Sequence, residues 1–135
     1  MRNQRNGEIM KVTVIPTLYR DAANGKVHGE IHVQGEFSSD ELGSMRAALE
    51  DGLYYVPGQI GLVHYGSGEY SSYPCEDDHG WQELCLGEIA VVDAEQVSGR
   101  VSVSEGPEDG GTAAEFVARV TSAAQVGWNP ALHAA

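Results

Sequence analysis

Apolar and polar residues alternate along two stretches near the start of the chain, Lys11–Tyr19 and Lys26–Phe37. Alternation with a period of two is typical of β-strands that bury one face. Between them stands Asn24-Gly25, a pair that suits a two-residue type I′ turn because both positions need a positive φ. The pattern therefore predicts an antiparallel β-hairpin.

A two-residue turn also determines which residues of the hairpin face each other, since a slip of one residue moves every side chain to the other face. It pairs Leu18 with Ile31 and Pro16 with Val33. Apolar or small residues then meet on one face and mostly polar residues on the other. Pro16 has no N–H to donate, so we expect the first strand to lie at an edge of the sheet or to carry a bulge.

Two later segments place apolar residues at the three- and four-residue steps of an amphipathic helix. Each begins with a capping box, in which a Ser or Thr is followed three residues later by Glu. Gly52 and Gly127 are expected to end these helices, and Trp128 to fold back onto the core. The boxes are Ser38 with Glu41 and Thr112 with Glu115; the apolar stripes are Leu42, Met45, Leu49 and Leu53, and Ala113, Phe116, Val117, Val120 and Ala124.

Three further segments have strand character: Ile60–Tyr65, Leu84–Asp93, which is a buried strand by composition, and Val97–Val103. The composition of residues 106–111 (GPEDGG) predicts a loop. Runs of strands interrupted by two helices favour the α+β class. We expect an antiparallel sheet of four to five strands, with both helices packed on one face.

We expect a single domain over residues 11–130, with a disordered or tag-like leader at 1–10 and a flexible tail at 131–135. The first residues contain no apolar core of a signal peptide, and no apolar run approaches the ~18 residues of a membrane span. The expected location is therefore cytoplasmic.

The chain is strongly acidic, with a formal net charge of −12. Ten acids and no Lys or Arg fall between residues 47 and 99. Such a surface repels nucleic acid and anionic membranes and attracts basic partners. The charge argues against direct binding of nucleic acid or membranes. It leaves two explanations open, solubility alone or a basic protein partner.

The longest stretch without a helix or strand period is Tyr65–Leu86. A long loop in a compact domain usually carries function, and Tyr and Trp among Ser, Gly and acids are typical of binding loops. The predicted binding residues are Tyr70, Tyr73, Glu76, Asp77, Asp78, His79 and Trp81. About half of the rings between residues 54 and 81 are expected in the core, above all Tyr54, Tyr55 and Trp81.

The same stretch holds both cysteines. Cys75, His79 and Cys85 follow the spacing C-x3-H-x5-C, which offers donors that zinc accepts, but the paired knuckles that mark zinc sites are missing. We expect no metal or other cofactor; if a metal is bound, these three are its ligands. The acids nearby raise the pKa of a thiol, which argues against a nucleophilic cysteine, and a Cys75–Cys85 disulfide is not expected in a reducing compartment.

These observations favour a small non-catalytic protein that binds or inhibits a partner through its basic surface, with the general character of antitoxin, immunity or phage-type antagonist proteins. No motif in the chain specifies a reaction. One alternative is an enzyme or a binder of a small molecule or metal that uses the acid–His cluster at residues 76–79. Another is an assembly subunit that forms a homodimer through the Pro16-bearing edge strand.

Overall fold

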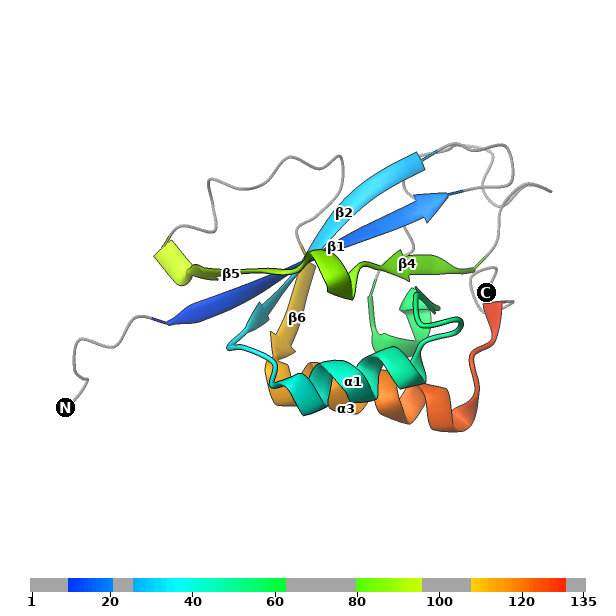
Figure 1. Cartoon of the computed structure of the whole chain (residues 1–135). Coiled ribbons are helices and arrows are strands. Elements are labelled where there is room, and N and C mark those ends of the chain that lie inside the picture. The colour runs from blue at the N-terminus through cyan, green and yellow to red at the C-terminus, as the bar shows by residue number, and fades with distance from the viewer. Residues whose placement is uncertain (1–9, 21–25, 63–79, 96–107, 131–135) are drawn as a thin grey trace.

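The structure is a computed structural model that describes residues 10–20, 26–62, 80–95 and 108–130. Within these residues two α-helices pack against one mixed β-sheet, so the predicted α+β class is confirmed (Figure 1). The strands are β1 (Lys11–Arg20), β2 (Lys26–Gln34), β3 (Tyr54–Tyr55), β4 (Gln82–Leu84), β5 (Ala90–Asp93) and β6 (Glu108–Thr112). The helices are α1 (Ser39–Ala48) and α3 (Ala113–Val126), with short 3₁₀ turns η1 (Pro57–Ile60) and η2 (Leu86–Glu88).

The sheet runs in the order β3-β4-β1-β2-β6, and β5 pairs with β1 as well. β6 lies parallel to β2, whereas the other pairs are antiparallel. The predicted antiparallel sheet of four to five strands is therefore confirmed only in part, because the parallel strand β6 makes the sheet mixed. Residues 108–111 of β6 fall within the predicted loop, because the sequence of this strand, EDGGT, contains no apolar residue. The strand predicted at 97–103 lies outside the described residues.

The hairpin forms, but in a different register from the predicted one. Ile15 pairs with Ile31 and Arg20 with Lys26, so five residues connect the strands and not two. This shift of three residues turns the opposite face of β1 to the core, where Ile15 is fully buried. β1 has apolar residues on both faces, so its pattern does not select a register. The turn pair Asn24-Gly25 lies outside the described residues.

Pro16 lies in the centre of the sheet, which corrects the expectation of an edge strand. Its carbonyl faces the side of β4 and β5 and accepts a hydrogen bond from the Cys85 N–H at 3.0 Å. β5 pairs with Lys11–Val14 and β4 with Thr17–Leu18, and the 3₁₀ turn η2 separates them opposite the proline. The missing donor thus coincides with a break in the partner strand. The strand predicted at Leu84–Asp93 is therefore divided into β4 and β5 by η2. Because β1 pairs on both sides, it is not an edge strand through which a homodimer could form.

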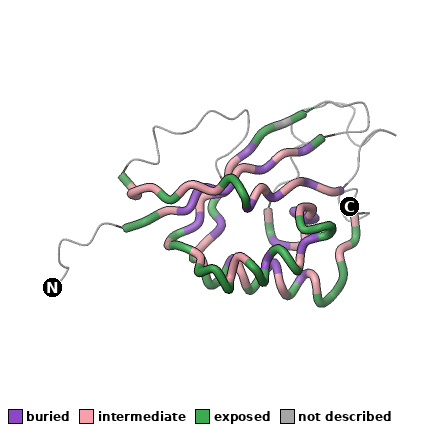
Figure 2. The backbone as a smooth tube through the Cα atoms, in the orientation of Figure 1, coloured by how far each residue is buried: buried purple, intermediate pink, exposed green. Residues whose placement is uncertain are grey.

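Both capping boxes are confirmed. The Ser38 hydroxyl accepts from the Glu41 N–H at 3.1 Å, the Glu41 carboxylate accepts from the Ser38 N–H at 2.8 Å, and the same pair of bonds joins Thr112 and Glu115. α1 ends at Ala48, earlier than predicted, whereas α3 ends at Gly127 as predicted. The buried residues line the surface between both helices and one face of the sheet (Figure 2).

The segment after α3 is bonded to α1 and to η1. The Trp128 indole N–H donates to the Ala48 carbonyl at 2.8 Å, which confirms that this side chain folds back onto the core. The Gln59 side chain of η1 donates to the Gly127 carbonyl at 3.1 Å and accepts from the Asn129 N–H at 2.7 Å. Gly80 contacts Pro130 so closely that a Cβ at position 80 would overlap its carbonyl.

Candidate functional site

Tyr54 and Trp81 form an aromatic pair at the β3–β4 end of the sheet. Their ring centroids lie 6.3 Å apart at an interplanar angle of 65°, an edge-to-face arrangement. Successive side chains of a strand point to opposite faces. Tyr55 and Gln82 therefore point into the core, where the Gln82 amide donates to the Tyr55 hydroxyl at 2.9 Å. Tyr54 and Trp81 take the outward positions, and both are half-buried.

A tight turn at Asp51-Gly52 places two carboxylates beside this pair. Both central residues have positive φ, +54° at Asp51 and +72° at Gly52, as a type I′ turn requires. The turn is closed by the Leu53 N–H, which donates to the Glu50 carbonyl at 3.0 Å, and by two bonds of 2.9 Å between Glu50 and Tyr54. Glu50 and Asp51 are exposed, and neither forms an ion pair with a described residue.

Two hollows share these two rings in their linings. The larger, here called the aromatic hollow, has a volume of about 390 Å³ and is lined by Glu50, Asp51, Tyr54 and Trp81. The smaller, here called the Arg20 hollow, has a volume of about 170 Å³ and is lined by Leu18, Arg20, Tyr54, Trp81 and Glu83. In the Arg20 hollow Arg20 Nε lies 3.6 Å from Glu83 Oε2. The rings thus border one hollow with an internal cation and one with two carboxylates that form no ion pair with a described residue.

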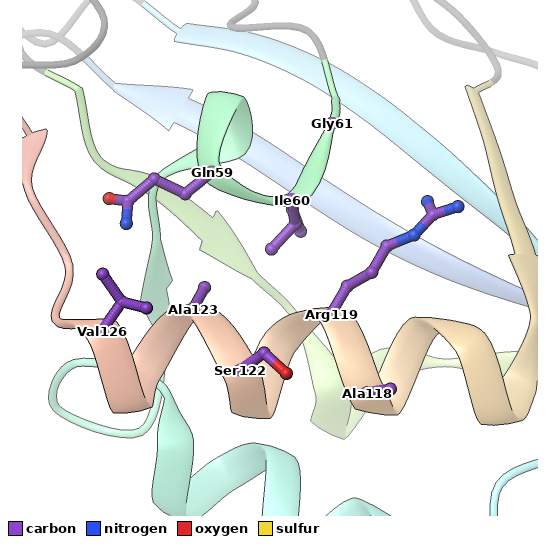
Figure 3. A pocket seen from close by; sticks show the side chains of 8 residues that line it. All are labelled: Gln59, Ile60, Gly61, Ala118, Arg119, Ser122, Ala123 and Val126. Carbon is purple, nitrogen blue, oxygen red and sulfur yellow. The ribbon is translucent and has the colours of Figure 1, made fainter.

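A larger groove of about 680 Å³ lies between η1 and α3 (Figure 3). Its lining is mostly apolar or small, and Arg119 is the charged residue among the described ones. The side chain of Gln59 already bonds to the segment after α3, and Val126 at the rim is 85% exposed. Among the described residues, no acid, aromatic ring, histidine or cysteine lines this groove. The lining residues are Gln59, Ile60, Gly61, Ala118, Arg119, Ser122, Ala123 and Val126.

Of the seven predicted binding residues, the structure describes Trp81, and it places this residue at the aromatic hollow. The other six, Tyr70, Tyr73, Glu76, Asp77, Asp78 and His79, lie outside the described residues and stay predictions. The core expectation is confirmed for Tyr55, which is fully buried, and is wrong for Tyr54 and Trp81. The sequence analysis did not select Tyr54, Glu50 or Asp51. The signal available for them was the turn pair Asp51-Gly52, which Leu53 separates from Tyr54.

Cys85 is a free, half-buried thiol at the start of η2. Burial and, to a smaller extent, the carboxylates of Glu88 and Glu83 raise its pKa to about 11. Its two suggested co-ligands, Cys75 and His79, lie outside the described residues. Within the described ranges, no three His, Cys, Asp or Glu side chains are grouped so that they hold a metal ion. The zinc set of Cys75, His79 and Cys85 therefore stays a prediction.

Comparison of the chain with protein-family models, with curated proteins and with solved structures gives no match. The function is therefore inferred from the chemistry of the site itself. In the part of the chain that the structure describes, no helix has the length and apolar character needed to cross a membrane.

Proposed function

We propose that this protein is a small acidic, non-catalytic domain that binds a basic surface of another protein through the aromatic hollow and its rim. The observation that carries this proposal is the outward Tyr54–Trp81 pair, which lines one hollow with Glu50 and Asp51 and another with Glu83. Two large aromatic side chains thus meet two carboxylates that form no ion pair with a described residue.

The chemistry of this rim suits recognition of a protein. Tyr and Trp dominate the centres of protein interfaces because a half-buried ring buries much area at a low cost in side-chain entropy. Acids around such a centre attract a basic partner and speed its approach. The net charge of −12 extends this attraction beyond the site. The β-strands and the Asp51-Gly52 turn hold these side chains in place, so little ordering is needed on binding.

The alternative functions rest on other parts of the chain. An enzyme built on the acid–His cluster depends on residues 76–79, which lie outside the described residues. Assembly through β1 is not supported by the described strands, because β1 pairs on both of its sides. The strands at the two ends of the sheet are β3 and β6. None of the described contacts favours either alternative over recognition of a basic partner.

The proposal is tested with a charge-reversed protein, Glu50→Lys with Asp51→Lys, and a matched control, Glu36→Lys with Glu95→Lys. All four acids are exposed. Glu36 and Glu95 follow β2 and β5 at the Lys11 end of β1, whereas the hollow lies at its Arg20 end. The ten residues of β1 separate the two ends by about 30 Å. The control therefore changes the net charge equally, far from the site.

Each immobilised variant is incubated with a lysate of the source cells, and the captured proteins are quantified by mass spectrometry at low and high salt. We expect basic proteins that the wild type and the control capture, that high salt releases, and that the site variant loses. Trp81→Ala should lose the same proteins without any change in charge. Capture that depends on net charge alone, or that neither site variant alters, would contradict the proposal.

A further inference from the structure

Resting on the function proposed above, we infer that the aromatic hollow receives a single arginine side chain of the partner protein. The hollow presents two aromatic rings and two carboxylates, and none of the described residues that line it is basic. Glu50 and Asp51 have no ion-pair partner among the described residues. A cation placed there meets two carboxylates beside two aromatic rings, and the face of such a ring attracts a cation.

The Arg20 hollow provides an internal example of this chemistry. It shares Tyr54 and Trp81 with the aromatic hollow and contains one carboxylate, Glu83, with the guanidinium of Arg20 at 3.6 Å from it. The chain thus already places an arginine beside the ring pair. The aromatic hollow is lined by the same rings and by one carboxylate more, and none of the described residues that line it supplies a cation.

A guanidinium fits these surroundings better than the ammonium of lysine. It is planar, it stacks on aromatic rings, and it donates two parallel hydrogen bonds to one carboxylate. It is also less strongly hydrated, so less hydration is lost when it enters a half-buried site. The aromatic hollow offers both kinds of surface at once, since Trp81 and Tyr54 are half-buried and the carboxylates lie at the rim. Arginine is therefore the expected side chain, with lysine as the weaker ligand.

The test uses the two tryptophans of the chain as reporter and control. Protein labelled with ¹⁵N in the indole nitrogen gives one resonance for Trp81, in the hollow, and one for Trp128, whose N–H is bonded to the Ala48 carbonyl. The probe is a blocked glycine peptide with one central arginine. The matched peptides have citrulline, its neutral isostere, or lysine at that position.

We expect the arginine peptide to shift the Trp81 resonance in a saturable manner and to leave Trp128 in place. The citrulline peptide should cause no shift, and the lysine peptide should bind at least about threefold more weakly. The variant Glu50→Gln with Asp51→Asn should weaken arginine binding about tenfold, whereas Glu36→Gln with Glu95→Gln should change it less than about twofold. Asn is suited to position 51, since it tolerates the positive φ there.

An unchanged Trp128 resonance in each variant shows that the fold is intact. Equal shifts with arginine and citrulline, equal affinity for arginine and lysine, or no effect of the double neutralisation would each overturn the inference. If basic proteins are still lost on charge reversal while the arginine peptide leaves Trp81 unmoved, the inference fails and the proposed function stands. If charge reversal also leaves partner capture unchanged, the proposed function fails as well.

Discussion

The two ends of the sheet, β6 and β3, differ in how tightly their side chains are packed. At the β6 end, a Cβ placed on the buried Gly110 would lie 2.8 Å from Ile31 Cγ2 and 3.2 Å from a ring carbon of Phe116. Strand and helix therefore approach each other there without room for a methyl group. At the β3 end, Tyr54 and Trp81 surround a hollow of about 390 Å³ with acids at its rim.

This difference shows where the chain can change without losing its fold. A side chain that fills the interior contributes most to the free energy of unfolding, because its removal leaves a cavity. A half-buried ring beside an open hollow contributes less to folding and keeps exposed surface that can contact a partner. Phe116 represents the first case and Trp81 the second. We therefore expect substitutions at the two ends to differ in their effect on the free energy of unfolding, and carboxylates to have a smaller effect on a neighbouring thiol.

The largest expected effect is that of Phe116→Ala. Phe116 is fully buried and its ring lies 6.1 Å from that of Phe37, so its loss should lower the free energy of unfolding by about 3–5 kcal/mol. Trp81→Ala removes a half-buried ring and its contact with Tyr54, and should cost only about 1–2 kcal/mol. Urea unfolding followed by far-UV circular dichroism measures both values. Equal losses would mean that Trp81 belongs to the core and that the β3 end is not built for binding.

A smaller effect is expected from one added methyl group. Gly110→Ala forces a Cβ against Ile31, Val33 and Phe116, and should lower the free energy of unfolding by about 1–3 kcal/mol. The matched control is Gly43→Ala in α1, where no atom lies within 4 Å of the added Cβ. Because alanine is the better helix former, this change should stabilise the protein by up to about 1 kcal/mol.

Opposite signs for these two glycine substitutions, measured in the same urea titration, would confirm the close approach of β6 and α3. If Gly110→Ala leaves the free energy of unfolding unchanged, β6 does not pack against β2 and α3 as described. The β6 end of the sheet would then not differ from the β3 end in its packing. Neither substitution lies near the aromatic hollow, so binding to the arginine peptide should stay unchanged in both variants.

Local signals in the sequence predict the helices better than the sheet. Each capping box depends on two residues three positions apart, and both helices begin where their boxes place them. The hairpin register depends instead on which face of β1 is buried, and β1 has Val14 on one face and Ile15 on the other, both buried. β6 has no apolar residue at all and exists because Gly110 allows β2 and α3 to come close.

The candidate site, like the sheet, was predicted only in part from the sequence. Trp81 is predicted from the composition of its neighbourhood, and the structure places it at the hollow. Its partner Tyr54 depends on the pairing of β3 with β4, which joins segments 27 residues apart at the Gln82–Tyr55 bond. The carboxylates depend on a positive φ at Asp51. Neither the non-local pairing nor the conformation of the turn leaves a periodic pattern in the sequence.

The smallest expected effect is that of nearby carboxylates on the pKa of Cys85. The pKa of this thiol is raised to about 11, first by burial and then by Glu88 and Glu83, and Glu83 also lines the Arg20 hollow. In the unfolded chain the thiol ionises near pH 8.5. The contribution of the protonated Cys85 thiol to the free energy of unfolding is therefore complete below that pH. It is lost as the pH rises toward 11.

The thiolate is the reactive form, so a Cys75→Ser protein should react with an aromatic disulfide reagent at pH 8 roughly 100-fold more slowly when folded than in urea. Glu83→Gln should speed the folded reaction modestly, because the lost carboxylate charge no longer opposes ionisation, and Glu88→Gln should do so somewhat more. Glu36→Gln, at the other end of β1, should have no effect. If neither Glu83→Gln nor Glu88→Gln changes the reaction rate of the folded protein, burial alone raises the pKa of Cys85. The two carboxylates then have no effect on this half-buried thiol.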